Sequence, residues 1–281
     1  MMDTTTRLGN SLVQHGPFSN RIYLMKLDPH DLPSILEHLN ALCRENDYTK
    51  IFAKVPRTHA APFLKAGYVR EASVPGFFKG KEAGDFLSRF VDPRRADPGD
   101  HGPEIRRVLE LAEAKAGPAK IEPPGPDGNV VFACRPEDAE EMSVLYKQVF
   151  ATYPFPIHDP AYLRETMASH VAYFGIRVNG GLAALASSEM DTAAGNVEMT
   201  DFATLPEMRG RGLAQRLLAF MEVEMKQRGL VMAYTIARAL SAGMNITFSR
   251  RGYRFGGTLI NNTQISGKIE SMNVWYKPLK R

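Results

Sequence analysis

The sequence predicts an α/β protein of the α+β kind, in which a central mixed sheet is flanked by helices on both faces. Three observations predict it. Strand-like apolar runs alternate with amphipathic helical stretches over residues 130–281, a glycine-rich turn joins a strand to a long helix, and part of this pattern recurs over residues 21–90. A length of 281 residues suits two domains.

Proline and acidic residues mark the first elements of the C-terminal part. A strand-like run covers residues 130–134. Arg135-Pro136-Glu137-Asp138 then opens a helix, because proline and acids favour the first helical turn. Tyr153-Pro154-Phe155-Pro156-Ile157 holds too many prolines for a regular element, and a second helix is expected over residues 160–168.

Asn179-Gly180-Gly181 predicts a hairpin turn between strands at residues 171–178 and 182–188, since such a turn needs residues that tolerate a positive φ. Arg228-Gly229 is a typical helix end and bounds the longest amphipathic stretch. Apolar periodicity assigns the remaining elements, which are strands at 196–204, 230–237, from 252 and at 271–276, and helices at 209–227 and 241–251.

Proline and glycine punctuate residues 92–128 and disfavour regular structure over much of that stretch. We therefore expect three regions along the chain. They are an N-terminal domain over residues 1–95, a linker over 96–128 with a short helix at 104–116, and a catalytic domain over 129–281.

A short motif occurs twice in the chain. Phe63 and Gly67-Tyr68 have the same spacing as Phe248 and Gly252-Tyr253, and a strand-like run precedes each copy. The repeat predicts that the N-terminal domain is a degenerate partial copy of the catalytic one. The alternative is chance, because glycine-aromatic pairs end many helices. The N-terminal copy has no glycine-rich loop, so we expect it to bind no cofactor of its own.

Composition excludes several classes of function. The net charge of +4 is not concentrated in a basic run, so nucleic acid is not an expected partner. Cys43 and Cys134 are too few for a disulfide framework or a metal site. No apolar run is long enough to span a membrane, and residues 1–13 lack the apolar stretch of a signal peptide, so we expect a cytoplasmic protein. A homodimer is compatible with the sequence.

The main functional signal is the glycine-rich turn Arg209-Gly210-Arg211-Gly212, between a strand and a helix. Backbone N–H groups freed by small glycines, together with the helix dipole, form a site for an anion, and the two arginines add charge for a pyrophosphate. The spacing matches neither a P-loop nor a dinucleotide fingerprint. An ordinary glycine-rich turn is the alternative.

Arg209-x-x-Gly212-x-Ala214 resembles the pyrophosphate loop of the GNAT family of N-acetyltransferases. The resemblance covers residues 130–281 and implies the GNAT fold, with a GNAT-like N-terminal domain. It also implies acetyl-CoA as co-substrate, without a metal, and a splayed strand that pairs with the pantetheine arm. The residues expected to bind the cofactor are Phe202, Ala203, Thr204, Arg209, Gly210, Arg211, Gly212, Leu213, Ala214, Ser241, Asn245 and Phe248.

A narrower resemblance joins five segments to the beta-lysine N-acetyltransferases. It implies a small-molecule acceptor, beta-lysine, acetylated on its terminal amine to N-epsilon-acetyl-beta-lysine, a compatible solute. The segments that carry it are 77–80, 153–156, 198–204, 257–263 and 270–277.

An alkyl ammonium has a pKa near ~10.4, so it must lose a proton before its nitrogen can attack a thioester. Glu198 and Asp201 are the expected catalytic acids, and we favour Glu198 as the base or as the residue that positions a water. Strand alternation puts the two on opposite faces unless a bulge intervenes. Alternatively, either acid pairs with a substrate ammonium or with an arginine.

The developing oxyanion is expected near the N–H of Phe202 or Ala203. Many GNAT relatives carry a tyrosine at the position of Phe248, as a general acid for the departing thiolate. Phe248 has no proton to give, but a thiol of pKa about 8.5 can leave unassisted. We expect Tyr253 to lie in the core.

The acceptor has two ammonium groups and one carboxylate, so its pocket needs acids and a cation. Glu189, Glu198 and Asp201 suit the ammonium groups, and Arg164 or Arg238 suits the carboxylate. The residues expected to contact the acceptor are Tyr153, Phe155, Glu189, Arg238, Asn261 and Asn262. The alternatives are another small amine such as a polyamine or amino acid, a non-catalytic acyl-CoA sensor, and an adaptor whose N-terminal domain binds a partner.

Overall fold

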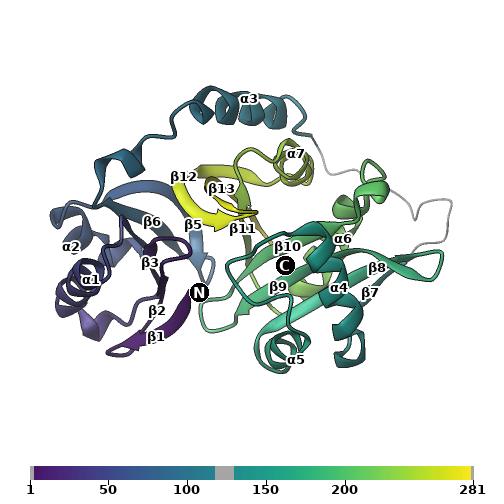
Figure 1. The fold of residues 1–281 in the computed structure, drawn as a ribbon, viewed down its shortest axis with the longest axis horizontal. Helices are drawn as coiled ribbons and strands as arrows, with labels where there is room; N and C mark the ends of the chain where they lie inside the picture. The colour runs from purple at the N-terminus through teal and green to yellow at the C-terminus, as the bar shows by residue number, and fades with distance from the viewer. Residues whose placement is uncertain (1–2, 118–129, 280–281) are drawn as a thin grey trace.

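One continuous sheet carries the whole chain. The computed structural model describes residues 3–117 and 130–279, and within them thirteen strands follow the order β1-β2-β3-β4-β6-β5-β12-β13-β11-β10-β9-β8-β7 (Figure 1). We call residues 3–90 the N-terminal half and residues 131–278 the C-terminal half. The two halves lie side by side in Figure 1, with β5 and β12 between them.

The N-terminal half consists of six strands and two α-helices. They are β1 (Thr4–Leu8), β2 (Ser11–Gly16), β3 (Arg21–Lys26), α1 (Ser34–Glu45), β4 (Lys50–Pro56), α2 (Ala60–Lys65), β5 (Val69–Phe78) and β6 (Glu82–Phe90). Apolar side chains of α1 and α2 pack on one face of β3 and β4 and form a core of their own.

The C-terminal half contains seven strands and four α-helices. They are β7 (Val131–Ala133), α4 (Ala139–Val149), α5 (Pro160–Ser169), β8 (Val171–Val178), β9 (Gly181–Asp191), β10 (Asn196–Thr204), α6 (Leu213–Gln227), β11 (Met232–Arg238), α7 (Ala242–Arg250), β12 (Arg254–Ile265) and β13 (Lys268–Pro278). Helices α6 and α7 pack on one core and α4 and α5 on another, so helices cover both faces of the sheet.

The two halves repeat one arrangement of strands. In each, a parallel pair (β3 with β4, β10 with β11) is linked by a helix, and a second helix leads into an antiparallel pair (β5 with β6, β12 with β13). This correspondence is what a duplicated fold would produce. The duplication itself stays a prediction.

The halves meet where β5 pairs with β12, at Ala72 and Gly257. A Cβ on Gly257 would lie 2.2 Å from the carbonyl oxygen of Glu71, and its φ of +140° also favours glycine. Strands from both halves then enclose one shared core on the inner face of the curved sheet. Its buried members are Tyr23, Phe52, Ala72, Val74, Phe77, Phe86, Met232, Tyr234, Leu259, Met272 and Val274.

The stretch expected as a linker contributes a packed helix. Helix α3 (His101–Glu113) begins three residues before the expected start and lies across the top of Figure 1, against α7. Ala112 is fully buried in the α6–α7 core, and the Ser249 hydroxyl donates to its carbonyl at 2.7 Å. The rest of the expected linker, residues 118–129, lies outside the described residues.

Most expected elements of the C-terminal half occur within a few residues of their predicted bounds, and β8 and β10 match them. The long helix is an exception, because α6 begins at Leu213 rather than at Arg209. Gly210 and Gly212 have φ of +77° and +73°, which a right-handed helix does not admit. In the described parts of the chain, none of the helices has the length and apolar character needed to span a membrane.

Candidate active site

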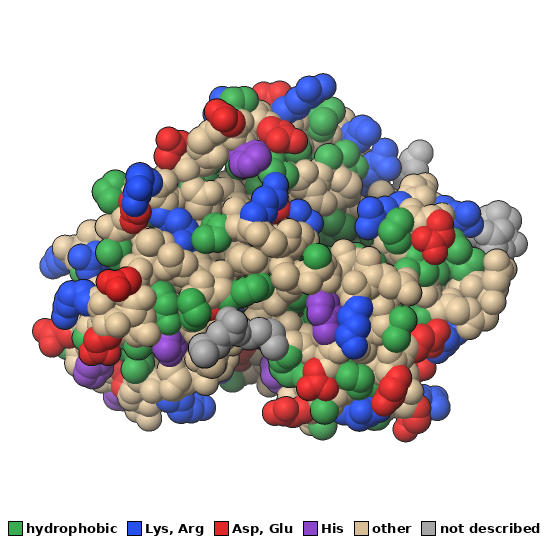
Figure 2. Space-filling view, viewed as in Figure 1, with side chains coloured by type: hydrophobic (Ala, Val, Ile, Leu, Met, Phe, Trp, Pro, Cys, Tyr) green, Lys and Arg blue, Asp and Glu red, His purple; other side chains and the backbone are tan. Residues whose placement is uncertain are grey.

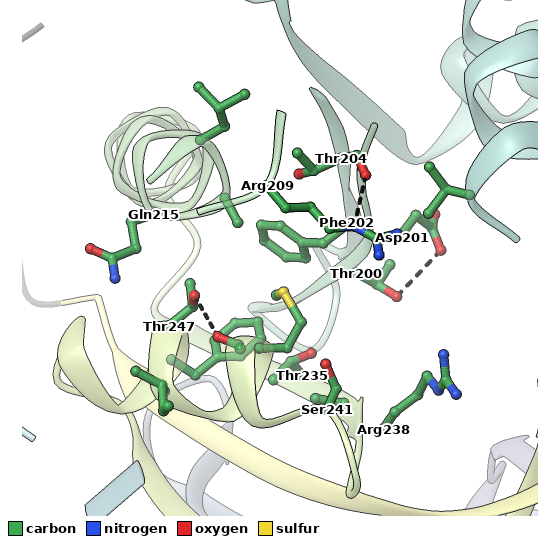
Figure 3. A pocket seen from close by; sticks show the side chains of 18 of the residues that line it. Thr200, Asp201, Phe202, Thr204, Arg209, Gln215, Thr235, Arg238, Ser241 and Thr247 are labelled. Atoms are coloured by element: carbon green, nitrogen blue, oxygen red, sulfur yellow. Dashed lines mark hydrogen bonds between the residues drawn. The ribbon is translucent and has the colours of Figure 1, made fainter. Parts of the chain in front are cut away.

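A cavity of about 830 Å³ opens where β10 and β11 separate. The two parallel strands pair only over Asn196–Glu198 and Met232–Tyr234, and beyond these rungs they diverge. Two consecutive residues of β11, Thr235 and Ile236, both line the cavity, and consecutive side chains of a strand point to opposite faces, so the cavity reaches both faces of the sheet through the gap. Figure 3 shows Gln215 and Thr247 on one side of the cavity, and Thr200, Asp201 and Arg238 on the other.

A β-bulge shapes β10 at this gap. Thr200 pairs with Ser187 of β9, but the next pair is Ala203 with Leu185, so Asp201 and Phe202 together oppose one residue. Asp201 has a φ of +55°, a strained conformation that often marks functional sites. The bulge releases backbone groups from the ladder between β9 and β10, at the place where β10 has also left β11.

The glycine-rich turn forms one wall of the cavity. Leu213, Ala214 and Gln215 line it, and their N–H groups have no acceptor within the helix because they belong to the first turn of α6. Arg209 and Arg211 are exposed beside them. Figure 2 shows Lys and Arg side chains around the upper right of the molecule, where α7 and this turn lie. Free amides, a helix dipole and two cations make this wall suited to a diphosphate.

Helix α7 forms the opposite wall, where Phe248 and Ser241, the residue just before the helix, line the cavity. The Phe248 ring meets Phe202 edge-on at 5.6 Å and Tyr253 at 5.1 Å. Tyr253 lies in the core, as expected from the sequence, with 4% of its surface exposed. Phe248 therefore joins the bulged strand to the core behind α7 by apolar contact alone.

Two carboxylates face each other across β9 and β10 at the last rung of the parallel pair. Glu198 pairs with Glu189 of β9 and with Tyr234 of β11. Burial, and then the charge of Glu189, raise the pKa of Glu198 to about 7, while Lys54 and a hydrogen bond from Tyr234 act to lower it. Burial also raises the pKa of Glu189. A carboxylate with a pKa near 7 can accept a proton at neutral pH.

Asp201 lies on the same face of the sheet as Glu198. Its carboxylate accepts hydrogen bonds from the Tyr153 hydroxyl at 2.5 Å and from the Ser187 hydroxyl. Ser187 pairs directly with Thr200, so it shares the face of Thr200 and Glu198. Burial raises the pKa of Asp201, and the hydroxyl donors oppose that rise. The bulge thus brings together two acids that strand alternation alone would separate.

Several expected contact residues are held by other partners. Arg238 lines the cavity, but its guanidinium is already bound by Glu270 at 2.6 and 2.8 Å. Arg164 pairs with Glu140 on the surface, away from the cavity. The proline-rich loop lines the cavity with Tyr153, whereas Phe155 packs against the α4–α5 core.

The structure places three of the expected contact asparagines away from the lining of the cavity. Asn261 donates to the carbonyls of Arg95 and Asp97, and Asn262 is 1% exposed and donates to Thr263, so both fix the bulge of β12 rather than line the cavity. Asn245 is fully buried inside α7. Near the acids, the structure adds Tyr23, Lys54, Ser187 and Tyr234, which the sequence analysis did not identify.

Asn245 is a structural residue, and this makes a testable prediction. Its amide oxygen accepts hydrogen bonds from Asn273 and from the Trp275 indole, both at 2.8 Å. Asn245→Ala should lower the free energy of unfolding by about 3 kcal/mol, because two buried donors lose their acceptor. Denaturant unfolding measures this loss. The affinity of the folded variant for acetyl-CoA should stay within threefold of wild type, and a loss of affinity without a loss of stability would restore the predicted cofactor contact.

Within residues 3–117 and 130–279, no group of three or more His, Cys, Asp or Glu side chains is arranged to hold a metal ion. The polar groups of the site are anion-binding amides, partly buried carboxylates and hydroxyls.

Comparison with known proteins agrees with this geometry. The model of the acetyltransferase (GNAT) family matches residues 139–243. Beta-lysine N(6)-acetyltransferase of Methanococcus maripaludis is 38% identical over 98% of this chain and 99% of its own length. N-acetyltransferase YodP of Bacillus subtilis is 32% identical over 96% of both chains. Beta-lysine N(6)-acetyltransferase of Methanosarcina mazei is 40% identical over 55% of this chain and 57% of its own. The chain therefore belongs to the GNAT acetyltransferase family.

Proposed function

We propose that the protein transfers the acetyl group of acetyl-CoA to the terminal amine of beta-lysine. One observation carries the proposal: a single cavity passes through the gap between β10 and β11, with the anion-binding turn on one side and partly buried acids beside the other. The names of two relatives supply the acceptor, one of them 38% identical over nearly the full length of both chains.

The cofactor side suits coenzyme A. The turn at Gly210 and Gly212 and the first amides of α6 would hold the diphosphate, as the exposed arginines beside them favour an anion. The free edge of β10 at Phe202 and Thr204 would pair with the amides of the pantetheine arm. Bound in this way, acetyl-CoA supplies an acyl carbon activated by its bond to sulfur.

Glu198 is the proposed base. It lies at the last rung before the strands separate, and a pKa of about 7 matches the pH at which it must take a proton from an ammonium, directly or through a water. The amine nitrogen then forms a bond to the acyl carbon, and the bond from that carbon to sulfur breaks. The thiolate leaves unassisted, which agrees with the apolar contacts of Phe248.

The bulge at Asp201 and Phe202 would stabilise the reaction. Backbone N–H groups that the ladder has released can donate to the thioester oxygen as negative charge develops on it. Asp201, held by Tyr153 and Ser187, supplies a fixed negative charge near the acceptor and favours a cationic substrate.

The acceptor is tested by measuring thiol release from acetyl-CoA with a panel of amines. We expect kcat/KM for beta-lysine to exceed the values for spermidine and for α-lysine by at least about tenfold, because the correct carboxylate and ammonium positions each contribute to binding. A preference for spermidine would contradict beta-lysine as the acceptor but would still support acetyl transfer to an amine. Tight binding of acetyl-CoA without turnover on any amine would favour the acyl-CoA sensor.

A further inference from the structure

The N-terminal half contributes a charged residue to the proposed active site. We propose that Lys54 on β4 is a positioning residue that acts on Glu198 through the hydroxyl of Tyr234. The inference rests on the proposed function, because it takes Glu198 as the base. It gives the half that lacks a glycine-rich turn a direct part in acetyl transfer.

The first step of the argument is the direction of the hydrogen bonds. The Lys54 ammonium lies 2.9 Å from the Tyr234 hydroxyl oxygen and can only donate to it. The Tyr234 proton is therefore free to point at Glu198, its partner in the last rung of β10 and β11, whose side chain lies on the same face of the sheet. Lys54 thus orients a hydroxyl that favours the ionised form of the carboxylate.

The second step is the way in which the fold brings Lys54 to this place. The sheet order separates β4 from β11 by four strands, and only the curvature of the sheet lets them meet across the shared inner core. The Lys54 nitrogen lies 5.3 Å from the centre of the Tyr234 ring and 5.7 Å from that of Phe77. These aromatic contacts hold the ammonium at the inner face, where its charge is poorly screened.

The third step is the balance of charge around Glu198. Glu189 on β9 and Asp201 on β10 are acids that disfavour its ionised form, and Lys54 is the cation that opposes them. Tyr234 on β11 and Tyr23 on β3 add hydroxyls. Among the described residues, no carboxylate lies within 4.0 Å of the Lys54 ammonium. Lys54 therefore forms no direct ion pair that would neutralise its charge. Removing Lys54 leaves the base among acids and hydroxyls, and the remaining cationic group is His170 when it is protonated, 3.9 Å from the carboxylate of Glu189.

The test is the pH dependence of kcat/KM for Lys54→Met. This value reports the free enzyme and the free amine, and the amine contributes equally to every variant. Without the ammonium, the pKa of Glu198 rises. The acid limb of the profile, which is the rise of kcat/KM with pH on its acidic side, should therefore shift to a pH about one unit higher. The rate at pH 6.5 should fall about tenfold and approach the wild-type rate near pH 9. Tyr234→Phe should move the limb in the same direction, and Lys54→Arg should restore it.

The matched control is Lys26→Met. Lys26 also crosses between the halves, but it pairs with Asp191 at 3.1 Å on the surface, so its removal should leave the acid limb in place. Thermal unfolding identifies any variant that fails to fold, and Tyr234→Phe, which loses one hydroxyl, then carries the test. An unchanged limb in folded Lys54→Met and Tyr234→Phe overturns the inference.

Two further outcomes separate this inference from the proposed function. A higher KM for beta-lysine, but not for its decarboxylated analogue 1,4-diaminopentane, with an unmoved limb, would make Lys54 a carboxylate-binding residue and overturn its action on Glu198. If wild type prefers another amine, the same pH comparison is made with that amine. In that case beta-lysine is not the acceptor, and the pH profiles measured with the preferred amine still show whether Lys54 acts on Glu198.

Discussion

Glu198→Gln is expected to lower kcat/KM for the acceptor amine by on the order of 100-fold or more, since a positioned base contributes 10² to 10⁴ in rate. The amide keeps the shape of the side chain but cannot take a proton. Steady-state thiol release at saturating acetyl-CoA measures the loss. The affinity for acetyl-CoA itself should change little, because the turn and the strand segment proposed to hold acetyl-CoA line the cavity, whereas Glu198 does not.

Glu189→Gln is the matched control for this experiment, because Glu189 lies directly opposite Glu198 and both are partly buried. Its removal takes away a like charge, so the pKa of Glu198 should fall and the acid limb should move to lower pH while turnover remains. If Glu189→Gln abolished turnover and Glu198→Gln retained it, the base would be Glu189.

Gly212→Val should raise the dissociation constant of acetyl-CoA by at least about tenfold. Gly212 has a φ of +73° at the start of α6, a conformation in which a β-branched residue is an outlier. Valine would force the turn into another shape and redirect the amides that are proposed to hold the diphosphate. Each charge-assisted hydrogen bond contributes about 1.5–3 kcal/mol, so the loss of one accounts for the expected change. Calorimetric titration with acetyl-CoA measures it.

Gly180→Val controls for the backbone cost alone. Gly180 has a φ of +85° in the hairpin between β8 and β9, and a Cβ there would meet no atom within 4 Å. It should lose about 1–2 kcal/mol of stability and keep wild-type affinity for acetyl-CoA. Equal affinities for wild type and Gly212→Val would contradict a diphosphate site at this turn.

The parts of the fold that sequence could predict are those with local causes. Asn179-Gly180-Gly181 specifies its own turn, and the strand before it ends at Val178 as expected. The start of α6 was wrong by four residues, because the two glycines of the turn adopt positive φ and exclude Arg209 from the helix. Gly257 carried no such signal, since its role depends on the approach of β5 from the other half.

The candidate site also has one part that the local sequence predicts and another that depends on distant segments. The cofactor side comes from one stretch of chain, from Thr204 to Gln215, and most of its expected residues line the cavity. The surroundings of Glu198 come from strands far apart in sequence, so Lys54 and Tyr234 carried no recognisable pattern. The contacts of Asn245 could not be read from the sequence, because its partners, Asn273 and Trp275, lie on β13 and become neighbours only after folding.

The shared inner core has a consequence for how this protein can change. Phe52, Phe77 and Phe86 belong to the half without the glycine-rich turn, yet they pack in the same core as Tyr234, which lies beside the proposed base. The apolar residues of the two halves therefore contact one another, and a substitution in this core of one half affects the packing of the other. Selection for acyl transfer in the C-terminal half therefore also constrains the apolar residues that the N-terminal half contributes to this core.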